Sequence, residues 1–281
     1  MTTGRIGGCQ VSAVPDGEGP AKAVPPRSFG EEGARLSYGA YLRLPDLLAQ
    51  QVPQSSAPDE LLFITVHQVY ELWFKLLLHE LEQARDAMAE GELWLAGHKF
   101  RRVHAIERVL VEQVEVLETM TPQDFLEFRA LLAPASGFQS VQFRELEFLS
   151  GAKDAAYLER FRGASDAEVA RLRRRLSEPT LWDAYLTALS RRGLPISDDE
   201  IMESLLTVAR DRGSHDDLWR LAEDLLTHDE TAAHWRMRHV QMVERQIGTK
   251  SGTGGSTGAP YLRGRTLLHY FPLLWELRSW L

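Results

Sequence analysis

The chain has 281 residues, of which 44% are hydrophobic, and a formal net charge of −8 at pH 7. This length and apolar content predict one globular unit with a substantial core. The acidic balance argues against binding to nucleic acid or to an anionic membrane surface, so we expect small molecules or proteins as partners. The lone cysteine, Cys9, excludes a disulfide framework and a cysteine-based zinc site, and it suits a reducing cytoplasm.

The start of the chain is rich in glycine, proline and alanine (TTGRIGGCQVSAVPDGEGPAKAVPP). It contains too little apolar surface to offset the entropy of folding, so we predict a disordered tail over 1–35 and a folded region over 36–281. This stretch lacks the apolar core of a signal peptide, and no run of about eighteen apolar residues occurs in the chain. We therefore expect a soluble cytoplasmic protein.

The folded region is predicted to open with a short amphipathic helical element, SYGAYLRLPDLLAQQ. Ser37 is a suitable N-terminal cap for it. Tyr38, Tyr41 and Leu42 fall on one face of this element, which makes that face a candidate for contacts beyond the element itself.

Two long helices are predicted next. From Leu61 to Met88 apolar residues recur at three- and four-residue steps, and Gly91 ends the segment. A second helix is expected over about 93–117 after a tight connection, so the two helices should pack antiparallel.

A shorter helix is predicted from the start signal in TMTPQDFLEFRALL, in which Thr121 is the cap and Pro122 the first helical residue. Phe125, Arg129 and Leu132 share one face of this helix. A guanidinium on an apolar face suits a carboxylate partner, although reaching for the surface or pairing with a neighbouring acid is the simpler explanation for Arg129 alone.

The rest of the chain also reads as helical. The segment VQFRELEFL forms a helix that ends near Gly151, and 152–230 breaks into helical fragments separated by glycine and proline. A further helix is expected over about 231–247, followed by a glycine-rich loop over 248–260. Since no alternating strand pattern occurs, we predict an all-α bundle that binds its ligand between helices, with 152–230 as an appended small helical subdomain.

Two histidines lie on strongly apolar helical segments, His67 in the first long helix and His239 in the last one. Each of them alone is more often a core histidine bonded to a nearby carbonyl group. A single neutral imidazole can nonetheless hold a heme iron from one side, and a second imidazole on another helix then becomes a distal group. There is no HExxH motif, which excludes a zinc-protease type of site.

Two tripeptides offer a different metal hypothesis. The sequences His215-Asp216-Asp217 and His228-Asp229-Glu230 match the short half of a two-histidine, one-carboxylate iron site, but such tripeptides are common by chance.

The glycine-rich loop, GTKSGTGGSTGAP, has three possible explanations. It lacks the GK[ST] ending of a phosphate-binding loop, and no strand precedes it. It could be a flexible linker. A loop with exposed backbone amides and the Thr253 hydroxyl could also fold over a polar ligand, with glycines supplying the tight turns.

Taken together, the segments FITVHQVYELWFK, LETMTPQDFLEFRALLAPASGFQSVQFRELE, WRMRHVQMVERQIGTKSGTGGSTGAPYL and YGAYLRL resemble the tryptophan 2,3-dioxygenase family. The resemblance runs from about Tyr38 to the end of the chain and is loosest across 152–230. It implies a heme-dependent enzyme that inserts O2 across the indole C2–C3 bond of L-tryptophan to give N-formyl-L-kynurenine, the first step of tryptophan catabolism by the kynurenine pathway. It also implies heme b as cofactor, O2 as co-substrate and a homotetramer built as a dimer of dimers.

The resemblance implies a role for each matching residue. His239 corresponds to the proximal heme ligand, and His67 to the catalytic distal residue that faces the indole nitrogen. Arg129 corresponds to the arginine that binds the substrate carboxylate, and Thr253 to the threonine that contacts the ammonium and carboxylate groups. The remaining expected substrate-binding positions are the pocket residues Phe63, Phe125, Leu132 and Ser136, and Tyr38, Tyr41 and Leu42, which would reach a neighbouring subunit's site.

Three other functions remain open on the sequence alone. Relatives of this kind can act on a substituted, for example methylated, tryptophan, and some could insert one oxygen atom to give an oxindole. A helical heme sensor or transport protein that uses His239 alone would leave Arg129, Thr253 and the glycine loop unexplained. A helical scaffold without heme is the weakest reading.

Overall fold

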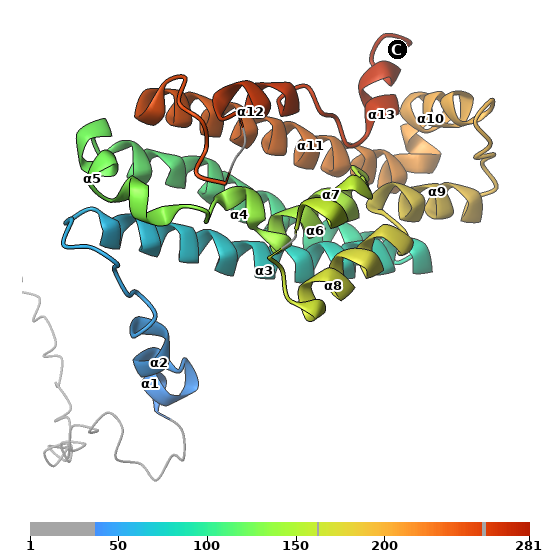
Figure 1. Ribbon diagram of the computed structural model, residues 1–281. Coiled ribbons are helices and arrows are strands. Elements are labelled where there is room, and N and C mark those ends of the chain that lie inside the picture. The colour runs from blue at the N-terminus through green and yellow to red at the C-terminus, as the bar shows by residue number, and fades with distance from the viewer. Residues whose placement is uncertain (1–36, 162, 255–256) are drawn as a thin grey trace, which may run out of the picture. The chain divides into compact units, whose positions relative to one another are not determined.

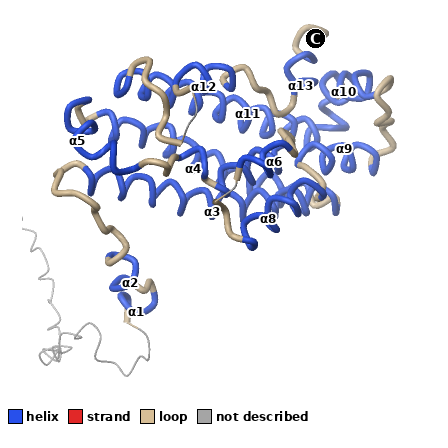
Figure 2. Tube along the Cα trace, viewed as in Figure 1, coloured by secondary structure: helices blue, strands red, loops and turns tan. Residues whose placement is uncertain are grey.

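The computed structural model describes residues 37–161, 163–254 and 257–281, and in these residues the chain forms helices and no strand (Figure 2). The all-α class is therefore confirmed. The expected disordered tail over 1–35 lies outside the described residues. The chain divides into a unit that ends at Gln50 and a second unit over 51–281.

The described part of the first unit contains two short helices, α1 (Tyr38–Tyr41) and α2 (Leu44–Leu48). Ser37 caps α1 as predicted, because its hydroxyl accepts a hydrogen bond from the Ala40 N–H at 3.2 Å. The single element expected here is interrupted at Arg43, whose φ of 52° is left-handed. Pro45 follows in the first turn of α2, where a missing N–H is tolerated, so the chain restarts a helix there.

The second unit is organised around a helical hairpin. Helices α3 (Glu60–Glu90) and α4 (Leu93–Glu118) confirm the two long helices expected from the sequence, and Gly91 makes the turn between them with a φ of 87°. Of the helices in the described residues, α3 alone is long and apolar enough to cross a membrane. Its buried side chains, such as Leu81 and Met88, belong to the main core.

The third long helix, α11 (Arg212–Ile247), packs along α4, and Figure 1 shows α3 and α11 running beside α4. It begins well before the helix expected from about residue 231. Leu218, Leu221 and Leu225 continue its apolar face toward the N-terminus and are fully buried. A kink at His215, where φ is −130°, marks the one irregularity inside it.

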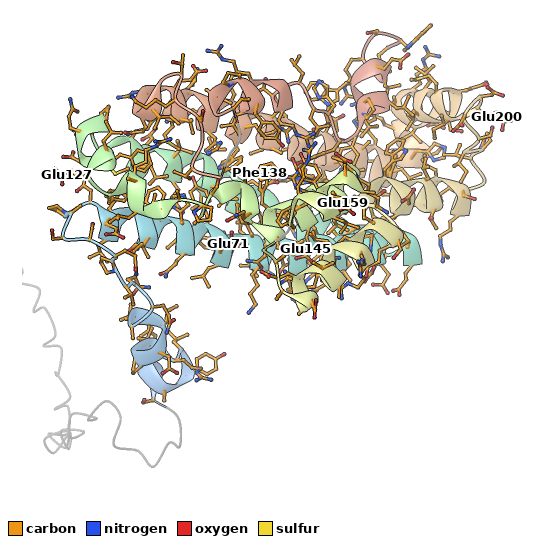
Figure 3. The ribbon with its side chains drawn as sticks, viewed as in Figure 1. Glu71, Glu127, Phe138, Glu145, Glu159 and Glu200 are labelled. Atoms are coloured by element: carbon orange, nitrogen blue, oxygen red, sulfur yellow. The ribbon has the colours of Figure 1, made fainter. Side chains whose placement is uncertain are left out.

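Shorter helices complete the second unit. They are α5 (Pro122–Leu132), the 3-10 turn η1 (Gly137–Gln139), α6 (Val141–Ser150), α7 (Ala156–Arg160), α8 (Asp166–Ser177), α9 (Leu181–Arg191), α10 (Ile201–Arg210), α12 (Ala259–Arg265) and α13 (Pro272–Leu277). Within 152–230, α9 and α10 contribute Leu181, Tyr185 and Leu205 to the same core as α3, whereas α7 and α8 join a small cluster around Phe148 of α6. Figure 3 shows the two ends of this unit, with Glu127 on α5 at one and Glu200, before α10, at the other.

A buried carboxylate fastens the C-terminal segment to α11. Asp229 is fully buried, and its Oδ2 accepts hydrogen bonds from the N–H groups of Tyr270 (2.8 Å) and Phe271 (3.1 Å) and from the indole of Trp275 (3.0 Å). These bonds satisfy two backbone donors at the start of α13, where no helical partner exists.

Replacing Asp229 by alanine should lower the free energy of unfolding by about 3–5 kcal/mol, because three buried donors lose a charged acceptor together. Urea unfolding followed by circular dichroism measures the loss. The neighbouring Glu230→Ala variant is a matched control, since Glu230 is exposed and should change stability by less than about 0.5 kcal/mol. Equal stability of the two variants would contradict the anchoring role.

A titratable histidine joins α4 to α11. His104 lies 3.3 Å from the Asp224 carboxylate through Nε2 and 3.5 Å from the Glu107 carboxylate through Nδ1. Burial acts to lower the pKa of His104, but its hydrogen bonds and charge interactions with Asp224 and Glu107 outweigh burial and raise it to about 9.

The raised pKa of His104 predicts that stability depends on pH. The folded protein holds this proton more tightly than the unfolded chain, whose histidine has a pKa near 6.5. The stabilisation is therefore complete below about pH 6.5 and is lost as pH rises toward 9, on the order of 2–3 kcal/mol in total. Urea midpoints at pH 6.5 and pH 9 should differ more for the unchanged protein than for His104→Gln; equal differences would exclude His104 as the source.

Candidate active site

A cavity of about 670 Å³ lies in the second unit, bounded by α3, α4, α5, α6, α11 and α12. This volume is typical of a pocket for a cofactor or small ligand. One wall comes from α3 and another from α11, and both helices pack on α4. The 3-10 turn and the glycine loop line it as well, through Phe138, Gly252 and Thr253.

The structure brings together most of the residues that the sequence indicated as a site. Eight of them line this one cavity, although they come from four separate parts of the chain: Phe63, His67, Phe125, Arg129, Leu132, Ser136, His239 and Thr253. Tyr38, Tyr41 and Leu42 belong to the other unit and are exposed there. Their expected contact with a neighbouring subunit stays a prediction.

His67 presents one ring nitrogen to the cavity as an acceptor. Its Nδ1 donates to the carbonyl oxygen of Phe63 at 2.7 Å, one turn earlier in α3. Burial lowers the pKa of His67, against smaller opposing effects of the Phe63 carbonyl and Glu71. A neutral ring with its proton on Nδ1 has a free electron pair on Nε2.

His239 contributes a second neutral imidazole from α11. Its ring is stacked on Trp235, with 5.1 Å between centroids and 5° between planes. Burial, and next the charge of His67, lower the pKa of His239 to about 4. The ring is therefore unprotonated near neutral pH, the form that can bind a metal.

Aromatic rings form the apolar wall beside His67. Phe63 lies 4.0 Å from the His67 ring, 5.7 Å from Phe125 and 5.6 Å from the fully buried Phe128, centroid to centroid. Phe125 and Phe128 meet edge to face at 5.5 Å. Such packing holds the rings in fixed orientations and gives the cavity a flat apolar surface.

The glycine loop is docked on the segment after α5. The Thr253 hydroxyl donates to the carbonyl oxygen of Ala135 at 2.6 Å, and the Arg129 guanidinium donates to the carbonyl oxygen of Ser251. At Gly254 a Cβ atom would lie 2.6 Å from the Cβ of Ser136, so glycine is required for this approach. The described part of the loop therefore forms one side of the cavity, and Arg129 and Thr253 lie where it meets the α5 region.

Sequence reasoning missed a cationic region of the cavity. Arg144, Arg236 and Arg265 line it, and Glu147 is the one carboxylate that pairs with any of them in the described residues. Arg236 donates instead to the Tyr270 hydroxyl (3.0 Å) and the Leu268 carbonyl oxygen (2.6 Å).

Two of these guanidiniums are incompletely bonded. The Nε atoms of Arg144 and Arg236 are buried and have no hydrogen-bond partner in the described residues. The Arg144 guanidinium also lies 3.4 Å from the Tyr157 ring centroid. The spacing of Arg144 and Glu147 on α6 is the one sequence signal that could have pointed here, since residues three apart share a helical face.

The two histidine-carboxylate tripeptides do not form an iron site. His228 hydrogen-bonds to Glu107 and Ser150, and Asp229 binds the C-terminal segment. No group of three or more metal-binding side chains occurs in the part of the chain that the structure describes.

The fold and the cavity define the chain as an all-α protein with a small-molecule site that contains two neutral imidazoles and a cationic region. A family model described as tryptophan 2,3-dioxygenase matches residues 25–201 and 197–281. The chain belongs to the tryptophan 2,3-dioxygenase family, whose members are oxidoreductases.

Proteins named tryptophan 2,3-dioxygenase are similar to it over most of their length. The protein from Nocardioides sp. is 66% identical over 259 residues, which cover 90% of this chain and 97% of that protein. The Herpetosiphon aurantiacus protein is 44% identical over 260 residues (87% and 98%), and the Geobacillus thermodenitrificans protein is 40% identical over 266 residues (89% and 93%).

Proposed function

We propose that this chain is a heme-dependent tryptophan 2,3-dioxygenase that converts L-tryptophan and O2 into N-formyl-L-kynurenine. Membership of the family supports the reaction. The observation that carries the proposal is the single cavity in which His67 and His239 come from different helices while Arg129 and Thr253 meet at its rim.

The residues present fit heme b. His239 is a neutral imidazole on a cavity wall and would hold the iron. Arg144 and Arg265 share the one carboxylate of Glu147, and Arg236 has no ion pair in the described residues, so this region has excess positive charge that the two carboxylates of heme would neutralise. The buried Nε atoms of Arg144 and Arg236 would also find acceptors there. When bound, heme supplies the iron that binds and activates O2.

The protein's own side chains bind and orient the amino acid. Arg129 would donate to the substrate carboxylate, and the Thr253 hydroxyl would contact the carboxylate and ammonium groups. The free Nε2 of His67 would accept the indole N–H, and Phe63, Phe125 and Leu132 would enclose the ring. Ser136 lines the same cavity and would lie close to the O2 co-substrate.

The reaction needs no external proton or electron. The indole C2–C3 bond breaks, and one atom of O2 becomes the ketone oxygen while the other becomes the formyl oxygen. The task left to the protein is therefore positioning, and holding two reactants in a productive geometry is worth several kcal/mol of the barrier.

The direct test is turnover under ¹⁸O2 with L-tryptophan and, separately, with a methylated tryptophan. The proposal expects a product of L-tryptophan that contains both labelled atoms. A product with one labelled atom would instead identify an oxindole-forming monooxygenase, and turnover of the methylated substrate alone would identify a different substrate.

The glycine loop should affect substrate binding more than cofactor binding. Replacing Gly254 by valine places side-chain atoms against Ser136 and should displace the loop from the segment after α5. KM for tryptophan should then rise by about tenfold or more, whereas heme content should not change. Steady-state kinetics and the heme spectrum give both quantities. Gly264→Ala is the control, because a Cβ there meets nothing within 4 Å and should leave KM unaltered.

We also propose that the protein assembles as a homotetramer, a dimer of dimers, in which Tyr38, Tyr41 and Leu42 reach the site of a neighbouring subunit. These three residues are 76%, 69% and 41% exposed, respectively, and together they form an exposed apolar group on one short segment, which is typical of an interaction surface. Light scattering measures the mass, and a monomer with full activity would exclude the shared site.

A further inference from the structure

A second, smaller cavity of about 50 Å³ lies next to the active-site cavity. Phe74, Phe143, Trp235 and Arg236 line both cavities, so these side chains form the wall between them. Trp235 is the member of this wall that is stacked on His239.

Three buried polar atoms of side chains that line the small cavity have no hydrogen-bond partner among the residues that the structure describes. They are Oε2 of Glu107, Nε1 of Trp235 and Nε of Arg236. One of these atoms is an acceptor and two are donors. Buried polar groups of this kind are rarely left unsatisfied.

Water is the ligand that fits this set of atoms. A water molecule needs about 10–15 Å³ of such space and two to four polar partners, and the small cavity supplies both. A single water can donate to Glu107 and accept from Trp235 or Arg236.

The acceptor in this set is held in its charged form. Burial alone would raise the pKa of Glu107, but the charge of His228, followed by hydrogen bonds from His104 and His228, lowers it below the usual value. In this carboxylate Oε1 accepts from Nδ1 of His228 at 2.5 Å, and Oε2 lies 3.5 Å from Nδ1 of His104. A carboxylate oxygen has two lone pairs, so Oε2 can also accept a hydrogen bond from water.

His228 links this carboxylate to the helix that carries His239. The Ser150 hydroxyl donates to the Leu146 carbonyl oxygen at 2.8 Å, so His228 Nε2 is the donor in its 2.8 Å bond to the Ser150 oxygen. His228, Trp235 and His239 are spaced by seven and four positions on α11 and therefore share one face. Glu107 and Ser150 hydrogen-bond to His228, the first of these three residues along α11.

We propose that the small cavity contains ordered waters that join Glu107 to Trp235 and Arg236, and that Glu107 acts through them as a positioning residue for His239. The waters fix the indole ring, and the indole ring, by stacking, fixes the plane of the His239 imidazole. This inference depends on the proposed function, since it assigns a task to the wall behind the iron ligand. It predicts that disturbing the waters alters the iron–histidine bond without removing heme.

The test reduces the volume of the small cavity by a substitution that leaves its polar side chains unchanged. Ala232→Val adds two methyl groups to a residue that lines the small cavity, and Ala233→Val makes the same change at the next position of α11, which does not line it. Both variants carry the same change in helix propensity. The ferrous heme form of each is measured by resonance Raman spectroscopy and redox titration, and the unchanged protein is crystallised to map waters.

The expected result is electron density for water within hydrogen-bonding distance of Glu107 Oε2 and Trp235 Nε1. Ala232→Val should shift and broaden the iron–histidine stretching band and move the midpoint potential at unchanged heme content, whereas Ala233→Val should leave both unaltered. Glu107→Gln, which keeps the shape of the side chain, should shift the band in the same way.

Two results would overturn the inference. One is a dry small cavity in the crystal, and the other is an Ala232→Val spectrum identical to that of the unchanged protein. A protein that binds no heme at all would instead refute the proposed function, and the water map would still decide whether the small cavity is a water site.

Discussion

Replacing His239 by glycine should yield a folded protein that no longer retains heme and has no dioxygenase activity. His239 is one of two neutral imidazoles in the large cavity and the one that would hold the iron; the described residues contain no cysteine and no group of three or more metal-binding side chains that could replace it. Heme content per chain, measured from the absorption spectrum after purification, gives the first result, and turnover gives the second.

Added imidazole separates loss of the ligand from loss of the fold. The glycine substitution leaves space where the ring lay, so free imidazole should restore heme binding and part of the activity if His239 is the ligand. His67→Gly is the matched control on the other wall: it should keep heme, because it removes an acceptor for the indole N–H and no bond to iron. If His239→Gly contains one heme per chain and has the absorption spectrum of the unchanged protein without added imidazole, the assignment of His239 as the ligand is refuted.

Helices could be predicted from the sequence where their apolar spacing, caps and terminating residues are local features. The apolar spacing of 61–88, the turn at Gly91 and the Thr121 cap with Asp124 are local features, and the structure contains each of them. The prediction was wrong for the start of α11, which was expected at about residue 231, whereas the helix begins at Arg212 and continues to Ile247 after a kink at His215. Packing of Leu218 and Leu221 in the core stabilises this earlier part of the helix, and such tertiary packing outweighs local propensity.

The candidate site was predictable in part for a similar reason. His67, His239 and Arg129 stand out because a polar residue on an apolar helical face needs a partner, whatever the rest of the fold. Arg236 and Arg265 carried no such signal, since they lie near charged neighbours in the sequence and meet only when α11 and α12 pack together. The small cavity behind Trp235 likewise depends on residues from α3, α4, α6 and α11, and spacing along one helix does not reveal it.

Replacing Arg129 by alanine should raise KM for L-tryptophan by about 10- to 150-fold while heme binding and stability are retained. A hydrogen bond between charged groups in a covered site contributes about 1.5–3 kcal/mol, and about 1.4 kcal/mol corresponds to a tenfold change in affinity. Glu127→Ala on the same helix is the control, because Glu127 is exposed at the end of the second unit that α5 forms (Figure 3) and should leave KM unchanged.

Arg129→Ala could also release the glycine loop, because Arg129 donates to the Ser251 carbonyl oxygen of that loop. Tryptamine, which has the indole and the ammonium group but no carboxylate, distinguishes loss of the carboxylate contact from release of the loop. If Arg129 binds the carboxylate, tryptamine affinity measured by titration of the heme spectrum should be the same in the variant and the unchanged protein. If affinity for tryptamine falls as much as affinity for tryptophan, Arg129 acts by holding the loop closed, and the carboxylate must be bound by another group.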